Sequence, residues 1–246
     1  MFAKPSSERL QFITVVTFGR SGSTAIQSAL NAHPQVLVRG ENYNALTGLW
    51  RYWQSVVETT DRHSAGKPEH PWFGSAKLDP QEVLADLHEQ VVSRLLRPKK
   101  ETLWTGFKEV RYEGAYFSNS ASLTQYLLFL QELIPELRFL VNIRSPETAA
   151  RSGWWSEHPD AIASLSNTVE HLRASSVQLT QMLGKGRVQL VNHDEWNQDP
   201  RIIFEALTEL GFPVNREILL ESMTQKLHHG QHSSEKQESG GPWVNN

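Results

Sequence analysis

The sequence predicts a three-layer α/β/α domain built on a mostly parallel central sheet. Strand-like runs alternate with helical patterns along the chain, the order that places helices on both faces of such a sheet. The runs 12–18 and 138–144 have the composition of buried strands, as expected for a sheet covered on both faces. The 246 residues are 39% hydrophobic and contain no repeat or linker-like segment, so we interpret residues 1–246 as one domain.

The expected strands are short runs rich in valine, isoleucine, leucine and phenylalanine. They cover residues 12–18, 35–39, 104–110, 138–144 and 188–192. Because a helical pattern follows each run, consecutive strands have room for the crossover that a parallel pair needs.

The expected helices repeat apolar residues three and four positions apart. Three of them begin with a capping residue followed by proline, at Asp79-Pro80, Ser145-Pro146 and Asp199-Pro200. The first expected helix ends at Leu30. The others cover residues 44–59, 80–96, 122–134, a turn from 146, 162–183, 200–210 and 217–227.

Two polar segments are expected to lie outside regular structure. Residues 60–79 form a long loop of the kind that often covers a substrate, and Trp72 within it is the best candidate to contact an acceptor. The composition beyond Gly230 is polar and rich in glycine, which predicts a flexible tail over about 230–246.

Composition excludes several classes of function. The net charge of −3 gives no general basic field for nucleic acid or an anionic membrane, so any anion site must be local. The absence of cysteine excludes disulfides, thiolate metal sites and a cysteine nucleophile. No apolar run is long enough to span a membrane and no signal peptide is recognised, so a cytoplasmic location is expected. The histidine cluster His228, His229 and His232 lacks a suitably spaced acidic partner, and no metal site is expected.

A short loop between the first strand and the first helix is the strongest candidate for an anion site. Strand, small-residue loop and helix together aim backbone N–H groups and a helix dipole at one anion. Two glycines permit a tight turn, three hydroxyls add donors, and one arginine adds positive charge. The six residues are Gly19, Arg20, Ser21, Gly22, Ser23 and Thr24.

Two other interpretations of this loop are an ordinary β–α turn and an ATP or GTP site. The nucleotide-triphosphatase pattern needs a longer loop with a lysine before its final serine or threonine. Here the loop is shorter, contains no lysine, and carries Arg20 before its second glycine. A phosphate or sulfate site without a metal is therefore favoured.

A second anion site is expected where the strand 138–144 ends. Arg144 lies at the carboxyl end of this strand, where open α/β sheets bind ligands, and Ser152 follows two helical turns later. Arginine can bind a phosphate through two N–H groups, although both residues could instead have ordinary surface roles. Two separated sites suit a nucleotide with phosphate on both sides of the ribose. A triphosphate would need an aspartate for magnesium where Arg144 stands.

At these residues the chain resembles a known family. The run Phe18-Gly-Arg-Ser-Gly-Ser-Thr24, followed by Leu30-Asn-Ala-His-Pro34, is similar to the 5′-phosphosulfate loop of carbohydrate-type and bacterial sulfotransferases. The spacing from Arg144 to Ser152 resembles their 3′-phosphate site. The resemblance covers roughly residues 12–195 and is weak over 44–103.

This resemblance implies a fold and a reaction. The fold is the P-loop NTPase-like sulfotransferase fold. The donor is 3′-phosphoadenosine-5′-phosphosulfate (PAPS), the product is the 3′,5′-bisphosphate, and no metal takes part. The acceptor is a hydroxylated small molecule, a carbohydrate or a glycolipid. Gly19, Arg20, Ser21, Gly22, Ser23, Thr24, Arg144 and Ser152 would bind the donor.

Sulfuryl transfer also needs charge stabilisation and a base for the acceptor hydroxyl. Arg20 is the natural stabiliser. Glu41 is the preferred base, because it follows the second strand, which commonly neighbours the first, and because some bacterial relatives place a glutamate there. It could instead complement the dipole of the next helix. Glu109, beside Lys108, is the main rival, and the imidazole candidates are His63, His70 and His88.

Two other functions remain open from the sequence. One is a P-loop kinase-like phosphotransferase that uses ATP and magnesium. The other is a protein that binds phosphoadenosine without catalysis.

Overall fold

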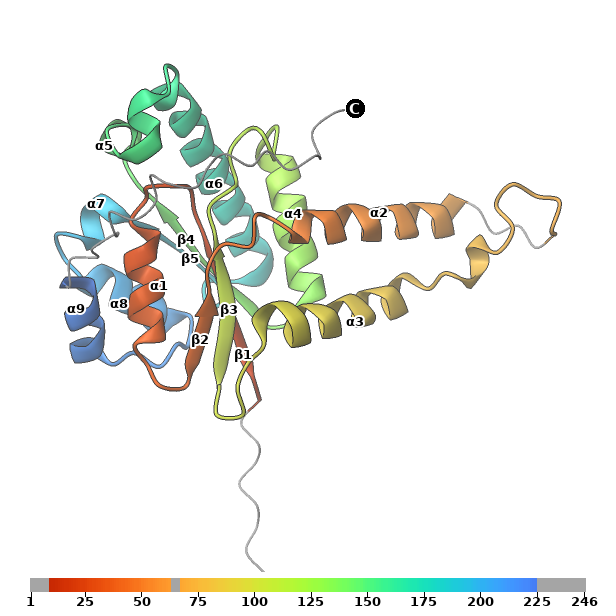
Figure 1. Cartoon of the computed structure of the whole chain (residues 1–246), viewed down its shortest axis with the longest axis horizontal. Coiled ribbons are helices and arrows are strands. Elements are labelled where there is room, and N and C mark those ends of the chain that lie inside the picture. The colour runs from red at the N-terminus through yellow and green to blue at the C-terminus, as the bar shows by residue number, and fades with distance from the viewer. Residues whose placement is uncertain (1–8, 63–66, 225–246) are drawn as a thin grey trace, which may run out of the picture.

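The computed structural model describes residues 9–62 and 67–224 and contains one five-stranded parallel sheet. Its strands lie in the order β2-β3-β1-β4-β5 and match the five expected runs within a few residues. They are β1 (Gln11–Val16), β2 (Val36–Arg39), β3 (Trp104–Glu109), β4 (Leu137–Ile143) and β5 (Val188–Asn192). The expected three-layer α/β/α architecture is confirmed, with helices on both faces of this sheet (Figure 1).

The side chains of β1 point alternately into two hydrophobic cores, one on each face of the sheet. Phe12 and Val16 join the core on one face, while Ile13 and Val15 join the core on the other. This alternation follows from the two-residue period of a strand buried on both faces. Helices cover both cores, so the sheet leaves only its strand ends for a ligand.

The helices on the face of Ile13 and Val15 come from the N-terminal and C-terminal parts of the chain (Figure 1). They are α1 (Ser23–Asn31), α7 (His193–Trp196), α8 (Arg201–Glu209) and α9 (Arg216–Thr224). The other face packs against helices from the middle of the chain. These are α3 (Pro80–Gln90), α4 (Ser120–Leu133), α5 (Pro146–Ala150) and α6 (Ala161–Leu183), with a π-helical turn (Val91–Leu96) after α3 and a 3-10 turn (Gly153–Glu157) after α5.

One expectation about the sheet is wrong. β2 does not neighbour β1, because β3 lies between them and pairs with both. Gly106 of β3 makes this close approach possible, since a Cβ there would overlap the carbonyl oxygen of Ile13 on β1. The residues after β2 therefore reach the end of β1 only across the width of β3.

The segment expected as a long loop lies away from the sheet. Helix α2 (Leu46–Arg62) projects outward beside α3, and residues 67–79 lie at the far end of this projection with one 3-10 turn, Ser75–Lys77 (Figure 1). Within the described parts of the chain, no helix is long and apolar enough to cross a membrane. The expected tail and the histidines His63, His228, His229 and His232 lie outside the described residues.

Candidate functional site

The small-residue loop closes the carboxyl end of β1 and starts α1. Gly22 precedes the helix at φ 82°, a left-handed conformation that glycine adopts without steric penalty. Arg20 is also left-handed, at φ 68°, which is uncommon for a residue with a side chain and is concentrated at functional sites. The first turn of α1 contains no acidic residue, so its positive dipole end is not neutralised from within the helix.

This loop lines a cavity of about 320 Å³ at the carboxyl ends of the central strands. The cavity collects residues from the loop, from the residues after β2, from β3 and from the segment after β4. Its lining consists of Gly19, Arg20, Gly22, Ser23, Thr24, Ala25, Glu41, Lys108, Val110, Arg144, Ser152 and Trp154. The structure therefore brings together Glu41 and every residue expected to bind the donor except Ser21.

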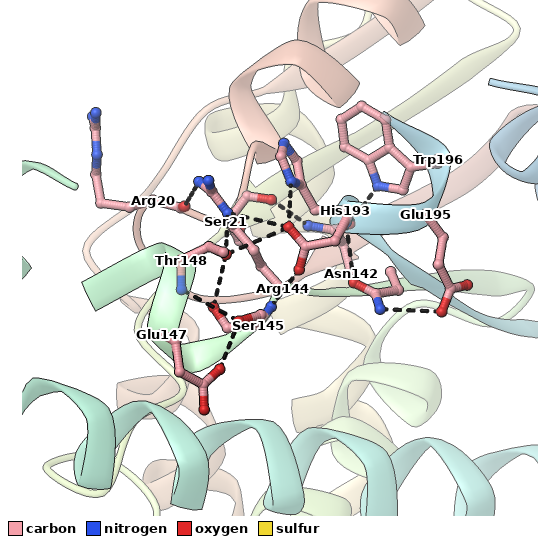
Figure 2. A network of polar contacts seen from close by, with 12 residues as sticks. Arg20, Ser21, Asn142, Arg144, Ser145, Glu147, Thr148, His193, Glu195 and Trp196 are labelled. Atoms are coloured by element: carbon pink, nitrogen blue, oxygen red, sulfur yellow. Dashed lines mark hydrogen bonds and ion pairs between the residues drawn. The ribbon is translucent and has the colours of Figure 1, made fainter. Parts of the chain in front are cut away.

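Ser21 instead connects the loop to Asn142 on the neighbouring strand β4 (Figure 2). Its side chain is fully buried, and its hydroxyl lies 2.7 Å from Oγ1 of Thr17, which is 2.6 Å from the carbonyl oxygen of Asn142 on β4. Asn142 Nδ2 donates to the Ser21 carbonyl at 2.9 Å, and its Oδ1 accepts from Trp196 Nε1 at 2.9 Å. This buried polar network fixes the loop to the neighbouring strand.

Arg20 connects the loop to the turn after α5. Its Nε donates to Oγ of Ser152 at 3.0 Å, and its guanidinium carbon lies 6.0 Å from the ring centre of Trp154. Gly153, at φ 59°, lies between Ser152 and Trp154 in the sequence, and a Cβ there would lie 2.9 Å from Arg20 Nε. The pairing of Arg20 with Ser152 therefore depends on a glycine at position 153.

Arg144 is held beside the same loop (Figure 2). Its Nη1 donates to the carbonyl oxygen of Arg20 at 2.9 Å, and its Nε donates to Thr148 Oγ1 at 3.1 Å. Asp194 lies 3.7 Å from Arg144 Nε and also accepts the Ser145 N–H at 2.7 Å. Most N–H contacts of Arg144 are to neutral oxygens, so much of its positive charge stays available to an anion.

Sequence reasoning missed Asp194 and the short helix α7 that carries it. Only its position could have indicated it, because the run His193-Asp194-Glu195-Trp196 directly follows β5 at the same edge of the sheet as Arg144. Asn192 caps this turn by accepting the Asp194 N–H at 3.1 Å. A single turn of four residues has no apolar periodicity by which it could be recognised.

Glu41 and Lys108 form the opposite wall of the cavity. Lys108 Nζ donates to Glu41 Oε1 at 2.7 Å, and Arg111 Nη1 donates to Glu41 Oε2 at 3.1 Å. Burial alone would raise the pKa of Glu41, but the hydrogen bonds and positive charges of Lys108 and Arg111 outweigh it and hold the pKa below its ordinary value. Glu41 is therefore an ionised carboxylate across the neutral range.

Glu109, the rival carboxylate, is committed to the backbone. Only 1% of its surface is exposed, and its Oε2 accepts the N–H groups of Asn42 and Asn44 at 3.0 and 2.8 Å. Its Oε1 accepts the N–H of Val110 at 2.8 Å and Nη1 of Arg111 at 3.1 Å. Glu109 thus fixes the chain that carries Glu41 and does not line the cavity.

The other candidates lie elsewhere. His88 Nδ1 is 2.8 Å from the carbonyl oxygen of Leu133, and His70 accepts the N–H of Trp72 at 3.2 Å. None of these residues lines the cavity, and Trp72 lies in the segment at the end of the α2 projection. Among the described residues, no group of three histidine, aspartate or glutamate side chains could hold a metal ion.

Comparisons with known proteins agree with the fold. A family model described as "Sulfotransferase family" matches residues 13–216, and no curated protein sequence matches the chain. Two similar solved structures are the sulfotransferase domain from the Synechococcus PCC 7002 olefin synthase and that from the curacin biosynthetic pathway. The first has a TM-score of 0.53 at 16% identity and covers 90% of this chain and 80% of its own. The second has a TM-score of 0.54 at 13% identity, with 92% and 82% covered.

Proposed function

The chain belongs to the sulfotransferase family, and we propose that it transfers a sulfuryl group from PAPS to a hydroxyl group of an acceptor. The observation that supports this most directly is the convergence of two cationic groups on one cavity. Arg20 enters it from the loop after β1 and Arg144 from the end of β4. A donor that carries anionic groups on both sides of its ribose needs two such positions.

The residues at the cavity fit this donor. The first residues of α1, Ser23 and Thr24, line the cavity, so the positive end of the helix and two hydroxyls face it. Gly22 has no side chain to obstruct an anion at this helix start. When bound, the donor supplies the sulfuryl group. Arg20 and the loop amides would stabilise the charge that develops there, and Arg144 with Ser152 would bind the 3′-phosphate.

We assign the proton transfer to Glu41. Its lowered pKa keeps the carboxylate unprotonated at neutral pH, and its place in the cavity lets it take the proton of the acceptor hydroxyl while the new oxygen–sulfur bond forms. Lys108 is 2.7 Å from the same carboxylate and lines the same cavity, so it can hold Glu41 in place and place a positive charge near the reacting groups. The oxygen–sulfur bond to the leaving phosphate breaks in the same displacement.

The acceptor class that we favour is a carbohydrate or glycolipid. Trp154 lines the cavity and is 59% exposed, so it offers aromatic surface on which a sugar ring could pack. Tyr43, two residues after Glu41, is 75% exposed, with its ring 4.3 Å from the Arg111 guanidinium carbon. Trp154 thus replaces Trp72 as the best candidate for acceptor contact.

Calorimetry with two ligands tests the donor assignment. The 3′,5′-bisphosphate of adenosine should bind without metal, and ATP with magnesium should bind much more weakly. Tight binding of ATP–magnesium with no binding of the bisphosphate would overturn the proposal in favour of a phosphotransferase.

A transfer assay tests catalysis separately from binding. Sulfur-labelled PAPS is incubated with glycan and lipid extracts, and labelled products are separated and identified. Label should appear in a hydroxylated acceptor. Bisphosphate binding without any labelled product across these extracts would favour a non-catalytic phosphoadenosine-binding protein.

A further inference from the structure

His193 stands directly behind the loop that would bind the donor (Figure 2). Its imidazole edge packs against Gly22, where a Cβ would lie 2.6 Å from Nε2 and would overlap Cδ2. Its ring meets the ring of Trp196 edge to face at 4.7 Å, and only 15% of its side chain is exposed. The imidazole is therefore fixed against the N-terminal end of α1, although it does not line the cavity itself.

Two charged residues act on this imidazole, one of each sign. Asp194, on α7, has Oδ1 3.4 Å from His193 Nδ1. The same oxygen lies 3.7 Å from Nε of Arg144, which follows β4 and faces the cavity. Asp194 therefore links His193 to a residue of the proposed phosphate site, and the backbone of α1 adds the positive end of a helix dipole.

These surroundings leave His193 neutral at neutral pH without a ligand. Burial lowers the pKa of His193, and the positive charge of Arg144 lowers it further. Asp194 raises the pKa of His193, but not enough to offset both effects. Burial lowers the pKa of His193 most, and the charge of Arg144 is the part of this balance that an anion in the cavity would neutralise.

We propose that His193 takes up a proton when the donor's anionic groups bind beside Arg144, so that protonation and donor binding favour each other. The inference rests on the proposed function of the cavity as the donor site. An anion bound at Arg144 cancels the repulsion between Arg144 and an imidazolium and adds negative potential. Asp194 already stands beside Nδ1 to accept a hydrogen bond from the charged ring. His193 is a positioning residue in this arrangement, since it acts through Gly22 and Arg144.

The sign of the linkage follows from the two protonation states. The bound complex holds His193 with a higher pKa than the free protein, so the complex binds more protons in the window between these two values. Within that window, donor affinity falls as the pH rises, by at most about tenfold per pH unit for one proton. The phosphate groups of the ligand titrate near about pH 6 and favour binding in the opposite direction, so measurements belong above about pH 7.

The test measures protons directly. Binding of the 3′,5′-bisphosphate of adenosine is followed by calorimetry in two buffers of different ionisation enthalpy, near about pH 7.5. We expect net proton uptake by the unaltered protein and an affinity that falls as the pH rises to about 8.5, by no more than about tenfold over this unit. His193→Gln keeps a polar side chain of similar length but cannot be protonated, so the uptake and the pH dependence should both disappear.

Two comparisons keep the test decisive. His33→Gln, beyond the end of α1, changes a histidine away from the cavity and should leave proton uptake unchanged. Asp194→Asn should reduce the uptake, because the imidazolium loses its anionic partner. Binding with no proton uptake, or uptake that survives in His193→Gln, would overturn the inference while leaving the donor site intact. No bisphosphate binding at all would instead show that the proposed function is wrong, and the inference with it.

Discussion

The positively charged side chains on the two walls of the cavity have different partners. On the wall formed after β1 and β4, Arg144 donates to the oxygens of Arg20 and Thr148, and its nearest carboxylate is 3.7 Å away. On the wall formed by β3 and the residues after β2, Lys108 is paired directly with Glu41 at 2.7 Å. The first wall leaves positive charge for an anion, while the second is internally balanced and presents an ionised carboxylate. The first wall is suited to binding a donor and the second to accepting a proton, and we call them the donor wall and the acceptor wall.

The two carboxylates of the second wall differ in exposure and in hydrogen-bond partners. Glu41 exposes 38% of its side chain and faces the cavity, whereas Glu109 is buried and accepts four backbone N–H groups. A carboxylate satisfied by backbone amides cannot take a proton without losing those bonds. Position in the sequence does not separate these residues, because each lies near a strand end.

The largest expected effect is on turnover. Glu41→Gln removes the proposed base while keeping the size of the side chain, so the rate should fall by about 10²–10⁴-fold. Affinity for the bisphosphate should stay nearly unchanged, because Glu41 belongs to the acceptor wall. Product formation from labelled PAPS and calorimetry measure the two effects. Glu101→Gln, an exposed change at a loop, is the matched control. Turnover within a few fold of the unaltered protein would remove Glu41 from the role of base.

The next effect concerns the donor wall. Arg144→Ala should weaken bisphosphate binding by about 1.5–3 kcal/mol, or roughly 10- to 150-fold, because a charge-assisted contact is lost. Arg151→Ala removes an exposed arginine from the same segment that does not line the cavity, and it should change affinity little. Calorimetry compares the two variants. Equal losses in both would mean that the phosphate is attracted by general charge and not by a defined position.

A third effect separates the two carboxylates by stability. Glu109→Gln replaces an acceptor of four backbone N–H groups by an amide with one acceptor oxygen, so unfolding should become easier by about 1–3 kcal/mol. Glu41→Gln, at a half-exposed position, should cost less. Urea unfolding monitored by circular dichroism measures both. A larger loss of stability in Glu41→Gln would reverse the roles that we assign to the pair.

The donor wall was largely predictable from sequence because its information is local. Gly19 to Thr24 specify a strand, a turn and a helix start within a dozen residues, and Arg144 directly follows its own strand. Even here the orientation of Ser21 was not predictable, since its hydroxyl is buried against Thr17 and β4. Hydroxyls in a glycine-rich loop look alike in sequence, and only the packing below the loop distinguishes them.

The acceptor wall depends on contacts between distant residues. Glu41 reaches the cavity although β3 lies between β2 and β1, contrary to the expected strand neighbours. The charge pairing of Glu41 joins residues 67 positions apart, and that of Asp194 with Arg144 joins two further segments. Strand order and register fix such pairs, and the apolar pattern of a strand does not reveal which strand lies beside it.

The smallest expected effect is in the pH profile, and it tests whether the second wall is balanced as its contacts indicate. Lys108 and Arg111 hold the pKa of Glu41 below its ordinary value, so the base loses its negative charge only as the pH falls through that lowered value. Measured as kcat/KM for sulfuryl transfer, the midpoint of the fall caused by protonating Glu41 should therefore lie below about pH 4.5. Arg111→Gln removes one of the two cations and should move this fall to higher pH, by less than about one unit because Lys108 remains. An acid limb near neutral pH that persists in Glu41→Gln would identify a different base.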